Sequence, residues 1–310
     1  MAQLLDGKAL ANSILNELKN KIAFLQKQVG IAPGLAILQV SGDAASDVYI
    51  KHKLNTAKKI GVEAKHYLFS SGVAESDIAA KIEELNKDPQ THGILLQLPL
   101  PKHFSPLNLI NAIDPKKDVD GLTASNLGGV LQNQKTLQPC TPIGILRLLT
   151  HYEIPLLGQE VVIINASQLV GKPLSLKLLN AGSTVTICHS KSLHIPQHLA
   201  QADIVISAIG KPNIIKSEWL QPGIVAIDVG IHRQMDGTLR GDFDFLSAAE
   251  KASWITPVPG GVGPMTVASL MENLLKCKIP FSNVGATRRV APTKALLPKT
   301  LSYFKNQKLI

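Results

Sequence analysis

Short apolar segments alternate with amphipathic ones along most of this chain, and this alternation constrains its fold more than any other feature. In the first half the segments are GLAILQV (34–40), DVYIKHKLNTAKKIG (47–61), EAKHYLF (63–69), SDIAAKIEELNKD (76–88) and HGILLQLPLP (92–101). Apolar runs of this length between helical patterns are typical of βαβ units, in which helices cover both faces of a parallel sheet. The sequence therefore predicts an α/β fold.

A second alternating series begins after an irregular stretch, TASNLGGVLQNQ (123–134), and a predicted helix, TPIGILRLLTHYE (141–153). Its segments are EVVIINA (160–166), LSLKLLNAG (174–182), TVTICHS (184–190), HLAQA (198–202), DIVISAIG (203–210) and IVAIDVGI (224–231). We therefore expect two parallel-sheet α/β domains, over residues 1–120 and 140–264, the second of them Rossmann-like. A last amphipathic helix, about residues 265–280, would pack back on the first domain.

The net charge of +9 is concentrated at the C-terminal end of the chain. From Lys276 onward there are eight Lys and Arg residues and no Asp or Glu, which leaves 24 basic and 23 acidic residues elsewhere. Because the chain before Lys276 is nearly neutral, nucleic-acid binding is disfavoured. A nucleic-acid-binding protein would instead show salt-sensitive binding that is lost when the residues after Lys276 are deleted. We expect residues 281–310 to form a basic tail that is either disordered or loosely docked.

The sequence lacks the features that are typical of membrane proteins, disulfide-linked proteins and metal-binding proteins. The segment MAQLLDGKALANSI has no basic region followed by an apolar one, and no apolar run approaches the roughly 18 residues that span a bilayer. We expect a cytoplasmic protein that does not associate with membranes. The three cysteines, Cys140, Cys188 and Cys277, are far apart, so we expect free thiols and no metal site.

A candidate nucleotide loop follows the strand VVIIN, where ASQLVGKPLSLKLL leads into a helix. Free N–H groups and the helix dipole favour an anion at such a helix start. Asn165 stands where a dinucleotide fingerprint has its first glycine, and Gly171 is the one glycine of the loop. Asn tolerates positive φ better than most residues, which keeps the turn possible, and Lys172 adds a positive charge.

The end of the next strand indicates which nucleotide would bind. An NAD site usually has an Asp or Glu here for the ribose 2′-hydroxyl, whereas this chain has His189, Ser190, Lys191 and Ser192. Donors and a positive charge suit a 2′-phosphate, so we expect NADP rather than NAD. The same residues could instead be an ordinary loop.

Tyr49 and Lys53 lie four residues apart on a predicted helix, so their side chains share a face. A phenol and an amine in this arrangement can orient a substrate and transfer a proton. The spacing is also the catalytic signature of short-chain dehydrogenases. Those enzymes carry their nucleotide loop before this helix, whereas here the candidate loop follows it by more than a hundred residues.

Two further polar side chains stand where strands or turns end. Gln97 lies near the end of GILLQLPLP, the edge at which parallel sheets bind ligands, and it could hydrogen-bond Lys53. Asp120 and Gly121 in DPKKDVDGL could present a carboxylate to a pair of N–H donors, although Asp-Gly is also simply a favourable turn.

The segment PVPGGVGPMT (257–266) combines glycines, which allow close approach, with prolines, which stiffen the backbone. It is either a tight connection or a loop that lies against a ligand. With YIKHK, GILLQLPLP, KKDVDG, PCTP, AIGKP and IDVGI, in this order, it resembles the bifunctional methylenetetrahydrofolate dehydrogenase/methenyltetrahydrofolate cyclohydrolase family. The resemblance covers residues 1 to about 280.

The resemblance implies oxidation of 5,10-methylenetetrahydrofolate with NADP and hydrolysis of the product to 10-formyltetrahydrofolate, in one-carbon metabolism and purine biosynthesis. It implies a folate-binding catalytic first domain, an NADP-binding second domain, an active-site cleft between them and a homodimer. The substrates would be tetrahydrofolate derivatives, with or without polyglutamate.

By the same resemblance, Lys53 is the catalytic lysine, Tyr49 positions the substrate and Gln97 holds Lys53. Asp120 would bind the aminopyrimidine edge of the pterin. Further substrate contacts would come from Gly263 and Pro264, and NADP contacts from Asn165, Ala166, Ser167, Ser190 and Ile231. The chain departs from the family pattern at Ile143, commonly a basic residue, and at Asn165, commonly Gly, so a cyclohydrolase with an impaired cofactor site is the alternative.

Overall fold

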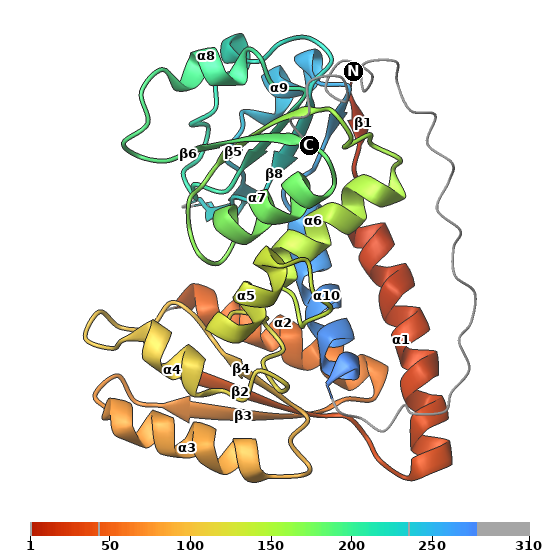
Figure 1. Ribbon diagram of the computed structural model, residues 1–310, viewed down its shortest axis with the longest axis vertical. Helices are drawn as coiled ribbons and strands as arrows, with labels where there is room; N and C mark the ends of the chain where they lie inside the picture. The colour runs from red at the N-terminus through yellow and green to blue at the C-terminus, as the bar shows by residue number, and fades with distance from the viewer. Residues whose placement is uncertain (1, 43, 235, 278–310) are drawn as a thin grey trace, which may run out of the picture. The chain divides into compact units, whose positions relative to one another are not determined.

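The computed structural model describes residues 2–42, 44–234 and 236–277, and shows a three-stranded and a six-stranded parallel sheet (Figure 1). In the smaller sheet β2 (Gly34–Val40) lies between β3 (Glu63–Phe69) and β4 (Gly93–Leu96). Its helices are α2 (Ala44–Ile60), α3 (Glu75–Lys87) and α4 (Pro106–Ala112). The predicted strands and helices of the first half are confirmed.

The larger sheet has the strand order β1-β11-β8-β7-β5-β6, and all of its pairs are parallel. Its strands are β1 (Gln3–Leu4), β11 (Trp254–Ile255), β8 (Val225–Asp228), β7 (Ile204–Ser207), β5 (Glu160–Ile164) and β6 (Thr184–Cys188). From β5 the chain passes to β6 on one side and then to β7 on the other. This reversal creates the crevice at the carboxyl ends of the strands where doubly wound sheets bind nucleotides.

Shorter elements complete this second half of the described chain. They are α7 (Gly171–Asn180), α8 (Ile195–Leu199), the 3₁₀ helix η1 (Ser217–Trp219), α9 (Phe245–Lys251) and an antiparallel pair, β9 (His232–Arg233) and β10 (Leu239–Arg240). The expected Rossmann-like α/β fold is confirmed.

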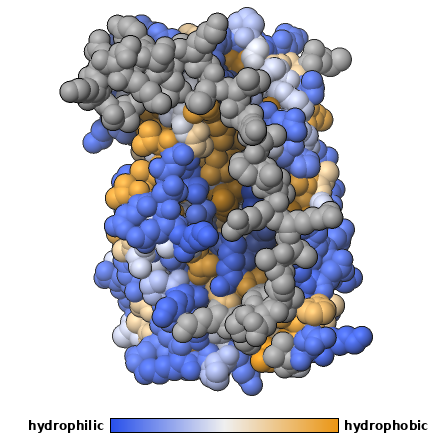
Figure 2. All heavy atoms as spheres, turned by 45° about the vertical axis from the view of Figure 1, so that its right-hand side comes forward, coloured by the Kyte–Doolittle hydropathy of each residue, from blue (hydrophilic) through white to orange (hydrophobic). Residues whose placement is uncertain are grey.

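Three helices run between the two sheets: α1 (Gly7–Val29), α6 (Cys140–His151) and α10 (Val262–Lys276) (Figure 1). α10 packs against both α1 and α6, and ten of its residues are buried. Asp6 caps α1 by accepting from the Ala9 N–H, and Gly30 ends it in the left-handed region. On the face that Figure 2 turns forward, which includes α1, most of the visible described surface is hydrophilic.

Two features differ from expectation. The stretch that we expected to be irregular contains a helix, α5 (Ala124–Leu131), which Thr123 caps by accepting from the Asn126 N–H. The N-terminal segment pairs with β11 through Gln3 and Leu4 and thereby extends the larger sheet.

The expected tail, 281–310, lies outside the described residues, as do the last residues of the predicted 265–280 helix. Among the helices of the described residues, none could cross a bilayer.

Candidate active site

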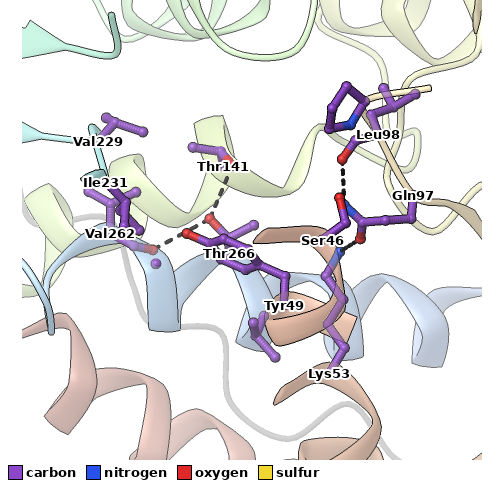
Figure 3. Close-up of a pocket in the computed structure, with 13 residues that line it drawn as sticks. Ser46, Tyr49, Lys53, Gln97, Leu98, Thr141, Val229, Ile231, Val262 and Thr266 are labelled. Carbon is purple, nitrogen blue, oxygen red and sulfur yellow. Dashed lines mark hydrogen bonds between the residues drawn. The ribbon is translucent and has the colours of Figure 1, made fainter. Parts of the chain in front are cut away.

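A cavity of about 320 Å³ is lined by side chains from both halves of the described chain (Figure 3). The elements that contribute are α2, the segment after β4, the start of α6, the loop after β8 and the first turns of α10. The lining residues are Ser46, Tyr49, Lys53, Gln97, Leu98, Pro99, Thr141, Val229, Ile231, Val262, Gly263, Thr266 and Val267. Four of the predicted catalytic and substrate-binding residues therefore line this cavity: Tyr49, Lys53, Gln97 and Gly263. One predicted cofactor residue, Ile231, lines it as well.

Lys53 and Gln97 make the hydrogen bond that the sequence suggested, with the Lys53 ammonium donating to Gln97 Oε1 at 2.9 Å (Figure 3). The Gln97 amide is itself fixed, because Nε2 donates to the Leu98 carbonyl at 2.5 Å. Its backbone N–H extends the sheet ladder to the Leu38 carbonyl at 2.8 Å. The acceptor that faces Lys53 is therefore held by a strand and by its own second hydrogen bond.

Tyr49 lies one helical turn before Lys53 on α2 and retains 38% of its accessible surface. Burial raises the pKa of its phenol, which keeps the hydroxyl protonated near neutral pH. Tyr49 can therefore present a ring face to a planar substrate and still donate a hydrogen bond.

Asp120 belongs to a turn that is braced from within by its neighbour Asp118. The buried Asp118 carboxylate accepts from the N–H groups of Gly121 at 2.9 Å and Thr123 at 2.7 Å. Gly121 has φ 70°, and a Cβ there would overlap the backbone of Gln138, so this turn requires glycine. Burial raises the pKa of Asp120, an effect that the positive charge of Lys53 opposes. Asp120 is thus close enough to Lys53 for the lysine charge to act on its carboxyl group. It is not among the residues that line the cavity in Figure 3.

The Gly/Pro loop forms a wall between this cavity and a second one of about 510 Å³. Pro264 lines the second cavity, and Gly263 lines both, together with Tyr49 and Ile231. Gly263 has only the Ile231 side chain within contact distance of a Cβ position, at 3.5 Å. A side chain at residue 263 would therefore project into open space beside Ile231.

The candidate nucleotide loop is held by Asn165 in a way that the sequence did not predict. Asn165 is not at positive φ. Instead, its Oδ1 accepts from the N–H groups of Ser167 at 2.8 Å and Gly171 at 3.0 Å, and its Nδ2 donates to the Ala208 carbonyl at 2.6 Å. A Cβ on Gly171 would overlap the Asn165 carbonyl oxygen, so helix α7 can start against β5 only with glycine there.

The other predicted cofactor residues lie apart from the two cavities. β5 and β6 pair in register, Ile164 with Cys188, so the loops that follow them leave the same edge of the sheet. Ala166 is half-buried in the first loop, and three exposed residues, Lys172, Ser190 and Lys191, follow the two strands. The turn 189–192 is closed by the His189 N–H, which donates to Ser192 Oγ at 2.9 Å. Of the predicted cofactor residues, Ile231 alone reaches the cavity of Figure 3.

Sequence reasoning missed several polar residues at the site. Ser46 is buried in the cavity wall, and Thr141 and Thr266 hydrogen-bond each other at 3.0 Å through their hydroxyl oxygens (Figure 3). PCTP and GPMT contain these threonines, but neither motif indicates that the two would meet. The described residues contain no group of three or more His, Cys, Asp or Glu that could hold a metal ion.

Two buried carboxylates brace the loops after β7 and β8. Asp242 accepts from the N–H groups of Ile209, Gly210 and Lys211 and from the Ser207 hydroxyl, at 2.7 to 3.0 Å. Asp228 accepts from three further N–H groups at 2.9 to 3.0 Å. Burial nevertheless raises the pKa of Asp228 to about 7, against these hydrogen bonds.

Comparison with known proteins decides the family. Residues 5–120 match the model of the tetrahydrofolate dehydrogenase/cyclohydrolase catalytic domain, and residues 139–279 match that of its NAD(P)-binding domain. The chain belongs to the tetrahydrofolate dehydrogenase/cyclohydrolase family. The bifunctional protein FolD of Nautilia profundicola is 43% identical over 279 residues, which cover 90% of this chain and 98% of that protein.

Solved structures of the same family agree with the fold. The bifunctional FolD enzyme of Campylobacter jejuni has a TM-score of 0.87 at 42% identity, covering 89% of this chain and 98% of its own. FolD of Trypanosoma brucei, solved with NADP and an inhibitor, has a TM-score of 0.86 at 32% identity, covering 89% and 97%. The family resemblance seen in the sequence motifs is confirmed.

Proposed function

We infer that this enzyme oxidises 5,10-methylenetetrahydrofolate to 5,10-methenyltetrahydrofolate with NADP and then hydrolyses that product to 10-formyltetrahydrofolate. The observation that carries this function is the match of the two family domains to the two halves of a chain whose shared cavity holds the Lys53–Gln97 pair. NADP is the hydride acceptor of the first reaction. The basic turn after β6, with no acidic residue between Ser183 and Gln201, fits its 2′-phosphate.

Within this function, we propose roles for the residues that surround the reacting carbon. Asp120 would accept hydrogen bonds from the aminopyrimidine edge of the pterin, and Tyr49 would pack on the ring system. Gly263 and Pro264 would let the substrate approach the backbone at the start of α10. The pterin would then lie between Lys53 and the wall that contains Ile231.

The hydrolysis step needs a group that handles protons. Water adds to the methenyl carbon and loses one proton. The bond from that carbon to N5 then breaks as N5 gains a proton and the new hydroxyl loses its own, which leaves the formyl group on N10 and releases one proton overall. We propose that the Lys53 amine carries these protons and that Gln97 keeps it directed at the carbon. Because Gln97 Oε1 only accepts, it orients Lys53 without competing for the substrate's acceptor atoms.

The proposal also covers the roles of the two domains, the localisation and the oligomeric state of the enzyme. We assign folate binding to residues 1–120 with the helix at about 265–280. We assign NADP binding to residues 140–264, which include Ser167, Gly171, Lys172 and Lys191. We also propose a cytoplasmic homodimer that accepts folates with or without polyglutamate. Sedimentation of the full chain would test the dimer, and KM values for mono- and polyglutamylated substrates would test the last point.

The decisive test is Lys53→Met, measured in two assays. We expect hydrolysis of methenyltetrahydrofolate to be lost, while the Kd for NADP stays within about twofold, because the nucleotide loops lie at another sheet edge. Lys51→Met is the matched control, because Lys51 is an exposed lysine on the same helix. Unchanged hydrolysis in Lys53→Met would overturn the assigned role. Hydrolysis without NADP-dependent oxidation in the wild type would instead favour the cyclohydrolase alternative.

A further inference from the structure

Asn273 is a fully buried amide in the second half of α10, between the buried residues Met271 and Leu274. Its Nδ2 donates two hydrogen bonds to carbonyls far away in the sequence: Val119 at 3.0 Å and Gln138 at 2.8 Å. The same nitrogen lies 3.7 Å from Cys140 Sγ. A buried amide is costly unless its donors are satisfied, and here both N–H bonds are spent on tying two loops to one helix.

These contacts converge on the turn that presents Asp120. The Val119 carbonyl belongs to the peptide that directly precedes Asp120, and it accepts a second hydrogen bond from the Cys140 thiol at 3.3 Å. On the other side of Asp120, Gly121 lies flat against the Gln138 backbone, whose carbonyl Asn273 also holds. Asn273 therefore fixes the peptide before Asp120 and the surface on which the following residue rests.

The internal brace of the turn does not replace this link. Asp118 holds the N–H groups of Gly121 and Thr123, which sets the local shape of the turn but leaves its position relative to α10 open. Backbone hydrogen bonds also tie residues 117–119 to Ile94 of β4, and Asn273 supplies the direct link to α10. Asn273 lies seven residues after Thr266, or about 10 Å along the helix, and Thr266 lines the cavity.

We propose that Asn273 is a positioning residue for folate binding, which sets the Asp120 carboxylate at a fixed place relative to the cavity wall formed by α10. The pterin edge and the reacting carbon belong to one rigid ring system. An anchor displaced by even 1 Å would therefore misplace the carbon relative to Lys53. The proposal rests on the folate-binding function given above.

The test is a double-mutant cycle on the Kd for 5-formyltetrahydrofolate, an unreactive reduced folate, measured by calorimetry with saturating NADP. We expect Asn273→Leu to raise this Kd about tenfold, the size of one positioning hydrogen bond, and to leave the Kd for NADP unchanged. In an Asp120→Asn background the same substitution should raise the Kd by less than about twofold, because the group that it positions is already altered.

Two variants separate positioning from stability. Ser269→Ala is the matched control: Ser269 is buried on the same helix, and its hydroxyl has no hydrogen-bond partner among the described residues, so its folate Kd should not change. If Asn273→Leu does not fold, Asn273→Ser is used, because a serine hydroxyl can bond within its own helix but cannot reach either loop. An unchanged folate Kd in the Asn273 variant, or fully additive effects with Asp120→Asn, overturns the proposal. A wild type that binds no folate refutes the function itself.

Discussion

Replacing Asn165 with glycine tests whether the hydrogen bonds of this side chain stabilise the nucleotide-binding conformation of the loop. The family pattern that the sequence motifs resemble has Gly at this position, so Asn165→Gly restores that pattern. In this structure, however, the Asn165 side chain holds both ends of the loop and ties them to Ala208, which directly follows β7. We expect Asn165→Gly to weaken NADP binding.

The magnitude follows from the three hydrogen bonds that the side chain makes. Each contributes about 0.5–1.5 kcal/mol net, and a glycine in place of another residue adds roughly 0.5–1 kcal/mol of backbone entropy. Part of this is recovered, because the freed N–H groups lie in a half-buried loop that water can reach. We expect a loss of about 2 kcal/mol in the stability of the loop. If the binding-competent loop falls to roughly one-tenth of the population, the apparent Kd for NADP rises about tenfold.

The assay is calorimetric titration of NADP, with methenyltetrahydrofolate hydrolysis measured in parallel. Hydrolysis should be unchanged, because Asn165 lies outside the cavity of Lys53. Asn133→Gly is the control for an Asn to Gly change, since Asn133 is exposed and already has φ 54°, where glycine is tolerated. A Kd for NADP that stays the same or falls would refute the reasoning. A fall would mean that the Asn165 side chain occupies N–H groups that the cofactor needs.

Two further predictions concern charge. Ser190→Asp should reverse or erase the preference for NADP, because a carboxylate repels the 2′-phosphate and accepts from a 2′-hydroxyl; an unchanged ratio of kcat/KM values for NADP and NAD would contradict this. The raised pKa of Asp228, about 7 against an ordinary 3.8, means that the folded state binds more protons than the unfolded state between these values. The free energy of unfolding should therefore fall as pH rises from about 4 to about 7, and Asp228→Asn should flatten this dependence in denaturant titrations; equal slopes in both proteins would contradict it.

The helices and strands that could be predicted from the sequence are those whose own residues form a recognisable local pattern. β2, β5 and β7 are largely apolar runs with helices between them, and this pattern is sufficient to predict buried parallel strands. α5 was missed because Gly128 and Gly129 lower helix propensity. The structure explains one of them, since a Cβ on Gly129 would overlap the side chain of Thr136. A tertiary contact therefore required the residue that obscured the local signal.

The same distinction applies to the site. The Lys53–Gln97 hydrogen bond could be predicted, because helical spacing places Lys53 and the end of a strand places Gln97. Asn273 could not be predicted, since its partners lie 135 and 154 residues away and nothing in the pattern around it indicates a turn to hold. Asn165 was identified for the wrong reason: φ tolerance was expected, and side-chain hydrogen bonding was found.

The contacts of α10 are the reason why we expect mutations to separate the binding of the two substrates, although these substrates react in one place. Its Met265 and Ala268 belong to the core under the larger sheet, whereas Leu274 lies beside Gly93 of the smaller one. Its first turns line the cavity, and its last turns hold the Asp120 loop. The nucleotide loops leave a different sheet edge and share no hydrogen bond with this helix in the described residues. Changes along α10 should therefore act on folate affinity, and changes in residues 165–171 on NADP affinity, while the cavity between them senses both.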